Sequence, residues 1–230
     1  MRVASRGIVV FGDVVDSRRG AARSTEFLRA LRDELEDAYP AKQRLARFAF
    51  TQGDELQLLL APGSDPFLAA LRAGLREDSL PMRWAMVAGR IDVGSGPTIE
   101  RTGEAFLAAR DRIERAKVRR ERLVAHTGDP GCDALLADLA PSLPALLGDL
   151  TDRQRSLARL VLVDGLRRAD VAERLSVSRA TVSVMAERAH VRELGGLVAG
   201  LASVFRDGEA VANGDAAAVA GTVTAGAGAR

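Results

Sequence analysis

The sequence predicts an α/β domain followed by a small all-α domain, and three observations lead to this class. In the first half of the chain, short apolar runs alternate with segments of helical periodicity. From residue 149 the character changes, and the chain shows the pattern of short helices separated by turns. With 230 residues, 47% hydrophobic and 28% charged, the chain is long enough for two domains that each bury a core.

The apolar runs of the first half predict five strands, because each is short and bounded by turn residues. They are residues 6–12, 44–50, 56–62, 82–93 and 122–127. The second and third runs are separated by a short polar stretch, which predicts a β-hairpin that turns at or near Gly53-Asp54.

Helical spacing predicts three helices between these strands. The first covers residues 24–39 with Ser24 as its N-cap, the second opens at Asp65-Pro66, and the third follows a cap at Thr102. The first six elements therefore run β-α-β-β-α-β, the order of the ferredoxin-like split unit. This order places the first strand beside the hairpin in the middle of one sheet.

The second half is predicted to contain a helix-turn-helix. Thr151 and Gln154 form a capping box at the start of one helix, and residues 168–188 follow the pattern helix, turn, helix, with Ser178 as a cap. The tail is rich in glycine and alanine, which predicts disorder. The expected organisation is an α/β domain, a connector with a short helix, a helix-turn-helix domain and a disordered tail, at residues 1–127, 128–148, 149–207 and 208–230.

Acidic residues follow two strands that are predicted to be neighbours. Asp13 ends the first strand and Asp54 lies at the hairpin turn. Because neighbouring strands lie about 4.8 Å apart, the two carboxylates can share one divalent cation, Mg²⁺ or Mn²⁺. Asp16 and Glu55 would supply a second ion or an outer-shell contact. The alternative is that both stretches are ordinary polar turns.

Glycine and arginine residues beside these acids suggest a phosphate ligand. Gly12 and Gly53 each precede an acid, and a glycine allows the backbone to approach a phosphate closely. Arg18 and Arg19 follow the first loop and are suited to phosphate oxygens. The site is therefore expected to bind a nucleotide together with the metal.

Three segments of the first domain resemble the SatD family of bacterial proteins. They are "FGDVVDSRR", "FTQGDELQLLL" and "GEAFLAARDRIERAK", and the resemblance covers roughly residues 6–125. More distantly, the same order is similar to the palm-type catalytic domains of class III nucleotidyl cyclases and GGDEF diguanylate cyclases. This resemblance implies that Asp13, Asp54 and Glu55 hold metal ions on a nucleoside triphosphate, with the carbonyl of Val14 as a further ligand.

The likeness to the cyclases is incomplete on the later helix. Class III cyclases carry an Asn and an Arg there, whereas an ungapped alignment places Leu107 and Asp111 at these positions. A one-residue gap brings Arg110 into register but supplies no Asn. The resemblance therefore favours binding a nucleotide over cyclising it, and whether the chain is an enzyme stays open.

Residues 150–190 resemble the DNA-binding modules of sigma-factor region four and of LuxR-type regulators. This resemblance implies that the second helix of the unit lies in the major groove of double-stranded DNA. Its contact residues would be Arg179, Thr181, Ser183 and Arg188. The unit carries little net positive charge, so a homodimer that reads two half-sites is expected. The alternative is a helical hairpin used for packing or dimerisation.

A basic cluster follows the helix that ends near residue 118. Its members are Lys117, Arg119, Arg120 and Arg122. The cluster suits a phosphate or an acidic partner, and the alternative is a solvated helix end whose cations favour the C-terminus of the helix dipole.

Composition excludes several classes of protein. The single cysteine, Cys132, permits neither an intramolecular disulfide nor a cysteine-based zinc site. No secretory signal and no apolar run of about 18 residues is present, so a cytoplasmic protein without a membrane partner is expected. We expect a DNA-binding regulator whose first domain binds a metal and a nucleotide. The alternatives are a Mg²⁺-dependent nucleotidyl cyclase or transferase with a helical recruitment or dimerisation domain, and an interaction module with an inactive site.

Overall fold

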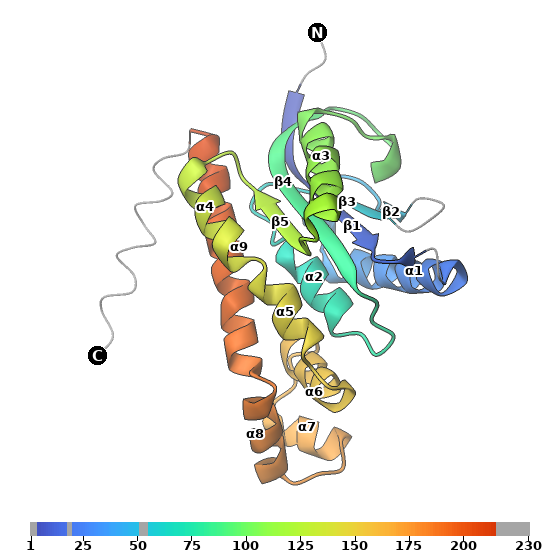
Figure 1. Ribbon diagram of the computed structural model, residues 1–230, viewed down its shortest axis with the longest axis vertical. Coiled ribbons are helices and arrows are strands. Elements are labelled where there is room, and N and C mark those ends of the chain that lie inside the picture. Colours follow the sequence, from blue (N-terminus) through green and yellow to red (C-terminus); the bar gives the residue numbers. More distant parts are fainter. Residues whose placement is uncertain (1–3, 18–19, 51–54, 215–230) are drawn as a thin grey trace.

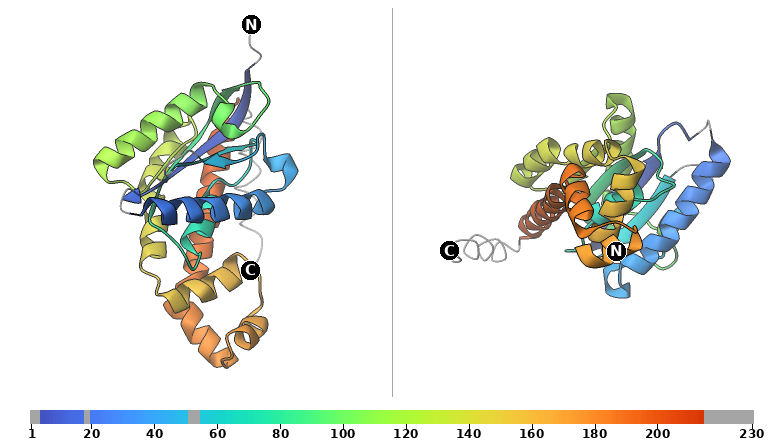
Figure 2. Two further views of the ribbon diagram at one scale, coloured as in Figure 1. Left: turned by 90° about the vertical axis from the view of Figure 1, so that its right-hand side faces the viewer. Right: turned by 90° about the horizontal axis from the view of Figure 1, so that it is seen from below.

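The computed structural model describes residues 4–17, 20–50 and 55–214. These residues form a mixed α/β structure in which a five-stranded sheet is covered by helices and continues into a long helical region (Figure 1). The views from the side and from below in Figure 2 show helices on both faces of the sheet. The broad class expected from the sequence is therefore confirmed.

The sheet has the strand order β2-β3-β1-β4-β5. Its strands are β1 (Ala4–Val14), β2 (Ala49–Phe50), β3 (Glu55–Leu60), β4 (Met82–Asp92) and β5 (Leu123–His126). The central strand β1 pairs antiparallel with both β3 and β4, and β5 pairs parallel with β4. The expected position of the first strand, beside the hairpin in mid-sheet, is confirmed.

The first strand of the hairpin is much shorter than expected. Only Ala49–Phe50 forms a strand, and Arg44 contributes an isolated bridge to Leu60. The carbonyl of Arg47 accepts hydrogen bonds from the backbone N–H and the hydroxyl of Thr98 instead of bonding a neighbouring strand. Because the carbonyl of Arg47 is bound by Thr98, the strand predicted over residues 44–50 is interrupted at this point.

Helices make up most of the remaining chain. They are α1 (Ala21–Ala38), α2 (Phe67–Gly74), α3 (Glu104–Arg119), α4 (Pro130–Leu139), α5 (Ser142–Gly148), α6 (Asp152–Leu162), α7 (Arg168–Arg174), α8 (Arg179–Arg188) and α9 (Val191–Ala212), with 3₁₀ turns η2 (Ala41–Gln43) and η3 (Thr98–Glu100). Across the described ranges, no helix has the length and apolar character needed to cross a bilayer.

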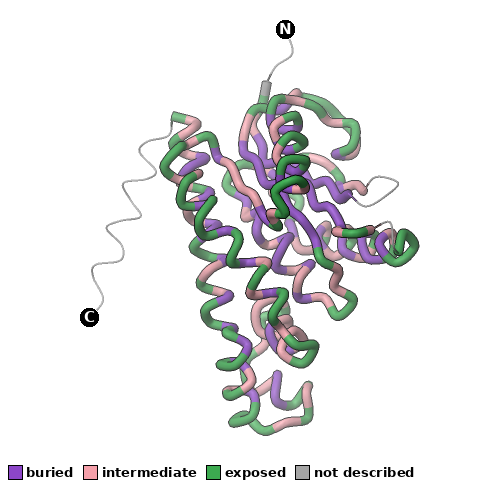
Figure 3. Tube along the Cα trace, viewed as in Figure 1, coloured by how far each residue is buried: buried purple, intermediate pink, exposed green. Residues whose placement is uncertain are grey.

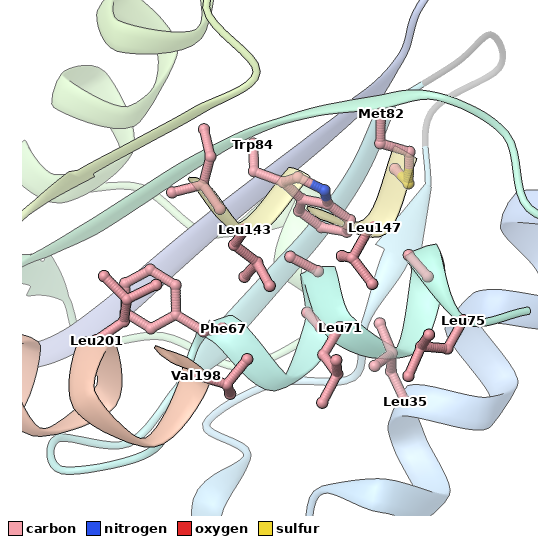
Figure 4. Packing of buried hydrophobic residues seen from close by; sticks show 14 of the residues in the cluster. Leu35, Phe67, Leu71, Leu75, Met82, Trp84, Leu143, Leu147, Val198 and Leu201 are labelled. Carbon is pink, nitrogen blue, oxygen red and sulfur yellow. The ribbon is translucent and has the colours of Figure 1, made fainter. Parts of the chain in front are cut away.

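The two faces of the sheet bury separate clusters, because side chains alternate along each strand. Val9 and Phe11 of β1 face α3, where Phe106 and Ile113 cover them. The intervening residues of the strands point to the other face of the sheet, which α1, α2 and the helical region cover. Trp84 belongs to this second cluster, which is seen from close by in Figure 4.

The helical region shares this second core with the sheet. The rings of Phe67 in α2 and Phe205 in α9 meet edge to face, with centroids 5.9 Å apart. Leu136 of α4 and Leu143 of α5 are fully buried in the same cluster. The predicted connector over residues 128–148 is therefore two packed helices rather than a linker between independent cores.

The predicted start of the disordered tail at residue 208 is wrong. Helix α9 continues to Ala212, and Gly208 and Glu209 are buried in it. A Cβ at position 208 would lie 2.4 Å from the Oγ1 of Thr127 and 2.7 Å from the Cβ of Cys132, so this glycine allows α9 to pack closely. Residues 215–230 lie outside the described residues.

Some of the predicted helix caps are present in the structure and others are not. The capping box of Thr151 and Gln154 and the cap at Ser178 are confirmed. Ser24 is not a cap, because α1 begins three residues earlier and buries this side chain. Thr102 is not a cap either, since its hydroxyl donates to the carboxylate of Asp92 over 2.7 Å.

Candidate functional site

Two predicted site residues, Asp13 and Glu55, meet at one end of the sheet. They are direct partners in the antiparallel register of β1 and β3. Arg83 of β4 is the partner of Asp13 on the other side. All three side chains project toward the face that α3 covers, and the two acids are only 4% and 5% exposed.

Each oxygen of the Asp13 carboxylate is bound by a different cation. The Nη1 of Arg83 donates to Oδ2 over 3.0 Å, and the Nζ of Lys117 lies 3.4 Å from Oδ1. Arg83 is itself held by the carbonyl of Glu121, which accepts from its Nε. The pKa of Lys117 is raised: its burial opposes the charged form, but the hydrogen bond to Glu114 and the charge of Asp13 outweigh that effect.

The Glu55 carboxylate is bound on both oxygens by Arg110 from α3. The Nη2 of Arg110 lies 2.7 Å from Oε1, and its Nη1 donates to Oε2. Gln57, two residues along β3 on the same face, donates to Oε1 over 2.7 Å. The guanidinium of Arg110 also lies 4.6 Å from the centroid of the Phe11 ring. Arg110 and Lys117 reach this place because they lie seven residues, about two helical turns, apart on α3.

The described residues do not fit a resident divalent cation. All four oxygens of Asp13 and Glu55 already bind a cationic or amide group, and a metal would have to displace these groups. Within the described ranges, no three His, Cys, Asp or Glu side chains are grouped so that they could hold a metal ion. Asp16 is exposed in the turn after β1, with φ 57°. Asp54 lies outside the described residues.

Gly12 has a packing role in this structure. A Cβ there would lie 2.5 Å from Cζ3 of Trp84 and 2.9 Å from Cε of Met82. The space beside Gly12 is thus filled by core side chains, which by itself accounts for a glycine at this position. Val14 is buried at the end of β1, opposite Met82.

The remaining nucleotide-binding predictions fall on residues that the structure does not describe. They are Arg18, Arg19 and Gly53.

The second candidate surface is the α7–α8 unit. Val171 of α7 and Val182 of α8 are fully buried between the helices, and the small residue Ala172 lies beside them. Ser176 takes the left-handed conformation in the turn, with φ 54°. The N–H of Val177 donates to the carbonyl of Ala172 over 2.9 Å, which closes the turn. The predicted helix, turn and helix are therefore present.

The four predicted DNA-contact residues are all in α8, but they do not share one face of it. At about 100° per residue, Arg179 lies on the opposite side of the helix from Thr181 and Arg188. Arg179, Thr181 and Arg188 are exposed, whereas Ser183 is half-buried. Gln154 of α6 donates to the carbonyl of Arg188 over 3.0 Å and so holds the end of α8 in place. Arg179 begins α8 and Arg188 ends it, so the predicted contact residues are spread along the whole helix.

The sequence pattern did not indicate two of the residues that bind the acid pair, Arg83 and Gln57. Arg83 lies in a long apolar strand, and only the pairing of β1 with β4 places it opposite Asp13. The position of Gln57 could have been predicted from the sequence, because residues two apart in a strand lie on the same face. The carboxylate of Glu55 and the amide of Gln57 were therefore predictable neighbours.

Comparison with known proteins finds no family model, no curated protein and no solved structure that matches this chain. The assignment of function therefore rests on the geometry of the two surfaces described above.

Proposed function

We propose that this chain is a DNA-binding transcriptional regulator of the SatD type, and that α8 is the helix that enters the major groove. The observation that carries this proposal is that Arg179, Thr181 and Arg188 are all exposed on a helix that buries Val182 and Ala186. Arginine suits base edges and phosphates, and threonine can contact either bases or phosphates.

The position of α8 supports DNA binding over a role in packing within the chain. Helices α7 and α8 form the tip of the molecule, far from the sheet (Figure 1). The outer sides of these helices are largely exposed in Figure 3. In the described part of the chain, no other segment covers the outer side of α8, so this surface is available to a partner.

Charge at the tip supports the proposal that the protein acts as a homodimer. Arg167 pairs with Asp170, and Arg192 pairs with Glu193, so much of the positive charge near α8 is compensated. Phosphate contacts supply a large part of the affinity of DNA-binding proteins. Two copies that read two half-sites would provide the contacts that one copy lacks.

The α/β half would bind the ligand that controls this regulator. Its strand order β2-β3-β1-β4 supports the ferredoxin-like palm topology expected from the sequence. Arg83, Lys117 and Arg110 already bind Asp13 and Glu55, which argues against a resident metal ion at this place. A Mg²⁺-dependent cyclase or transferase would require Asp13 to leave Arg83 and Lys117, and the regulator is therefore the preferred function.

A selection from random duplex DNA, followed by fluorescence anisotropy on the enriched sequence, tests this function. We expect Arg179→Ala and Arg188→Ala each to weaken binding by about 5- to 100-fold, the effect of one lost arginine contact. Arg29→Ala, an exposed arginine on α1, is the matched control and should leave binding unchanged. No enriched sequence, together with equal affinities of all variants for random duplexes, would overturn the proposal.

A further inference from the structure

A cleft of about 750 Å³ lies where the sheet meets the helical region. It is bounded by the end of α2, the start of β4, the loop at residues 120–122 and the helices α5 and α6. Met82 of β4 and Leu147 of α5, labelled in Figure 4, form its floor and belong to the core, whereas Leu80, Pro81 and Pro144 are its more accessible apolar lining. The volume is within the range of about 300 to 1,000 Å³ that is typical of small-molecule sites.

Only part of the basic cluster near the end of α3 lines this cleft. Arg120 and Arg122 line it, whereas Arg119 lines a separate shallow hollow on the outer side of α3. Within the described residues, the guanidinium groups of Arg120 and Arg122 have no hydrogen-bond or ion-pair partner. Arg120 is placed at the rim by its left-handed backbone, with φ 59°.

A third arginine and two acids complete the polar lining. Arg155 of α6 is fixed in the cleft because it donates to the carbonyls of Gly74 and Leu150. Glu121 and Asp149 also line the cleft. The lining therefore combines cations for an anionic group, carboxylates that accept hydrogen bonds from hydroxyl or amino groups, and an apolar wall.

We propose that this cleft binds a nucleoside monophosphate. The phosphate would lie on Arg120 and Arg122, since guanidinium groups bind phosphate oxygens with paired hydrogen bonds. The base would pack on the accessible apolar lining formed by Leu80, Pro81 and Pro144, and a carboxylate of the lining would accept hydrogen bonds from the ribose. This site is separate in its residues from the acid pair of Asp13 and Glu55.

Isothermal titration calorimetry of the full chain with adenosine and guanosine monophosphate tests the site, with inorganic phosphate as a further probe. We expect saturable binding of at least one nucleotide and no saturable binding of phosphate alone. The Arg120→Gln/Arg122→Gln variant should lose about ten-fold or more in affinity, the effect of losing one or two charge-assisted hydrogen bonds. Arg119→Gln removes the same charge one residue away and should bind as the unmodified chain does.

A second variant blocks the cleft without changing its charge. Ala145 is exposed and lines the cleft, so Ala145→Trp should abolish nucleotide binding while the circular dichroism spectrum and the melting temperature without ligand stay the same. The proposal is overturned if neither nucleotide binds, or if the affinity is unchanged in both cleft variants. Loss of binding in Asp13→Asn with retention in the arginine variant would place the nucleotide at the sheet end instead.

Discussion

Asp13 and Glu55 lie directly opposite each other in β1 and β3, yet each carboxylate is bound by its own cation from α3. Two buried carboxylates so close together would repel each other if both were charged and unpaired. Lys117 and Arg110 remove this repulsion and at the same time fasten α3 to the end of the sheet. The acid pair is therefore part of the structure as well as a candidate ligand site.

The pair of Glu55 and Arg110 should contribute measurably to stability. Replacing Arg110 with Met leaves a buried carboxylate with only Gln57, and we expect the free energy of unfolding to fall by about 2 kcal/mol. Urea denaturation measures this change. Arg115→Met on the same helix breaks an exposed pair with Asp111 and should cost about 0.5 kcal/mol or less. Equal losses in the two variants would contradict a structural role for the Glu55 pair.

Divalent cations should not stabilise the protein. The oxygens of Asp13 and Glu55 are bound by cations and Gln57, so millimolar MgCl₂ or a chelator should change the melting temperature by less than about 1 °C. Differential scanning calorimetry measures this. A resident ion at 100 times its dissociation constant would add about 2.7 kcal/mol, which is several degrees. A rise of that size that disappears in Asp13→Asn would show that a metal displaces the arginine and the lysine.

Gly12 should tolerate no side chain, because the Trp84 ring occupies the space beside it. We expect Gly12→Ala to lower the free energy of unfolding by about 1 to 3 kcal/mol, as overpacked cores do. Gly89→Ala in β4 is the control, since its new Cβ would lie 3.3 Å from the Cβ of Ala105, a milder contact.

A double-mutant cycle identifies the partner of this glycine. In a Trp84→Leu background, Gly12→Ala should cost clearly less than it does alone, because the overlapping ring is gone. Additive costs, measured by chemical denaturation of the four proteins, would mean that Trp84 is not what excludes a side chain at position 12.

Cys132 should be an unreactive thiol at neutral pH. Burial, followed by the hydrogen bond and the charge of Asp129, raises its pKa to about 11. Because only the thiolate reacts, alkylation by iodoacetamide at pH 8 should be about a hundred-fold slower than for a thiol of ordinary pKa. The rate, followed by mass spectrometry, should rise about ten-fold per pH unit from pH 8 to 10.

Asp129→Asn tests the cause of this shift. The asparagine keeps the N-cap of α4 but removes the charge beside the thiol, so the pKa of Cys132 should fall and alkylation should become faster. A reaction rate that already levels off near pH 8.5 in the unmodified chain would contradict the raised pKa.

Features set by neighbouring residues could be predicted from the sequence. The capping box of Thr151 and Gln154 and the turn before Ser178 depend on contacts three or four residues apart, and both are present in the structure. The adjacency of β1 and β3 also followed, because the order of strands and helices leaves few ways to pair them. The sequence placed Asp13 beside the hairpin but paired it with Asp54, which lies outside the described residues, and the register of β1 and β3 places Glu55 opposite it.

Features that depend on distant residues were decided by the tertiary structure. Asp13 is bound by Arg83 across 70 residues of chain, and no local pattern indicates that β4 would bring an arginine there. The end of α9 was misjudged for the same reason: a short segment that begins with a glycine and lacks large apolar residues forms a poor isolated helix, but Gly208 packs against Thr127 and Cys132. Local sequence thus determined the helix starts at Thr151 and Ser178, whereas burial and ion pairing between distant elements decided which side chains meet.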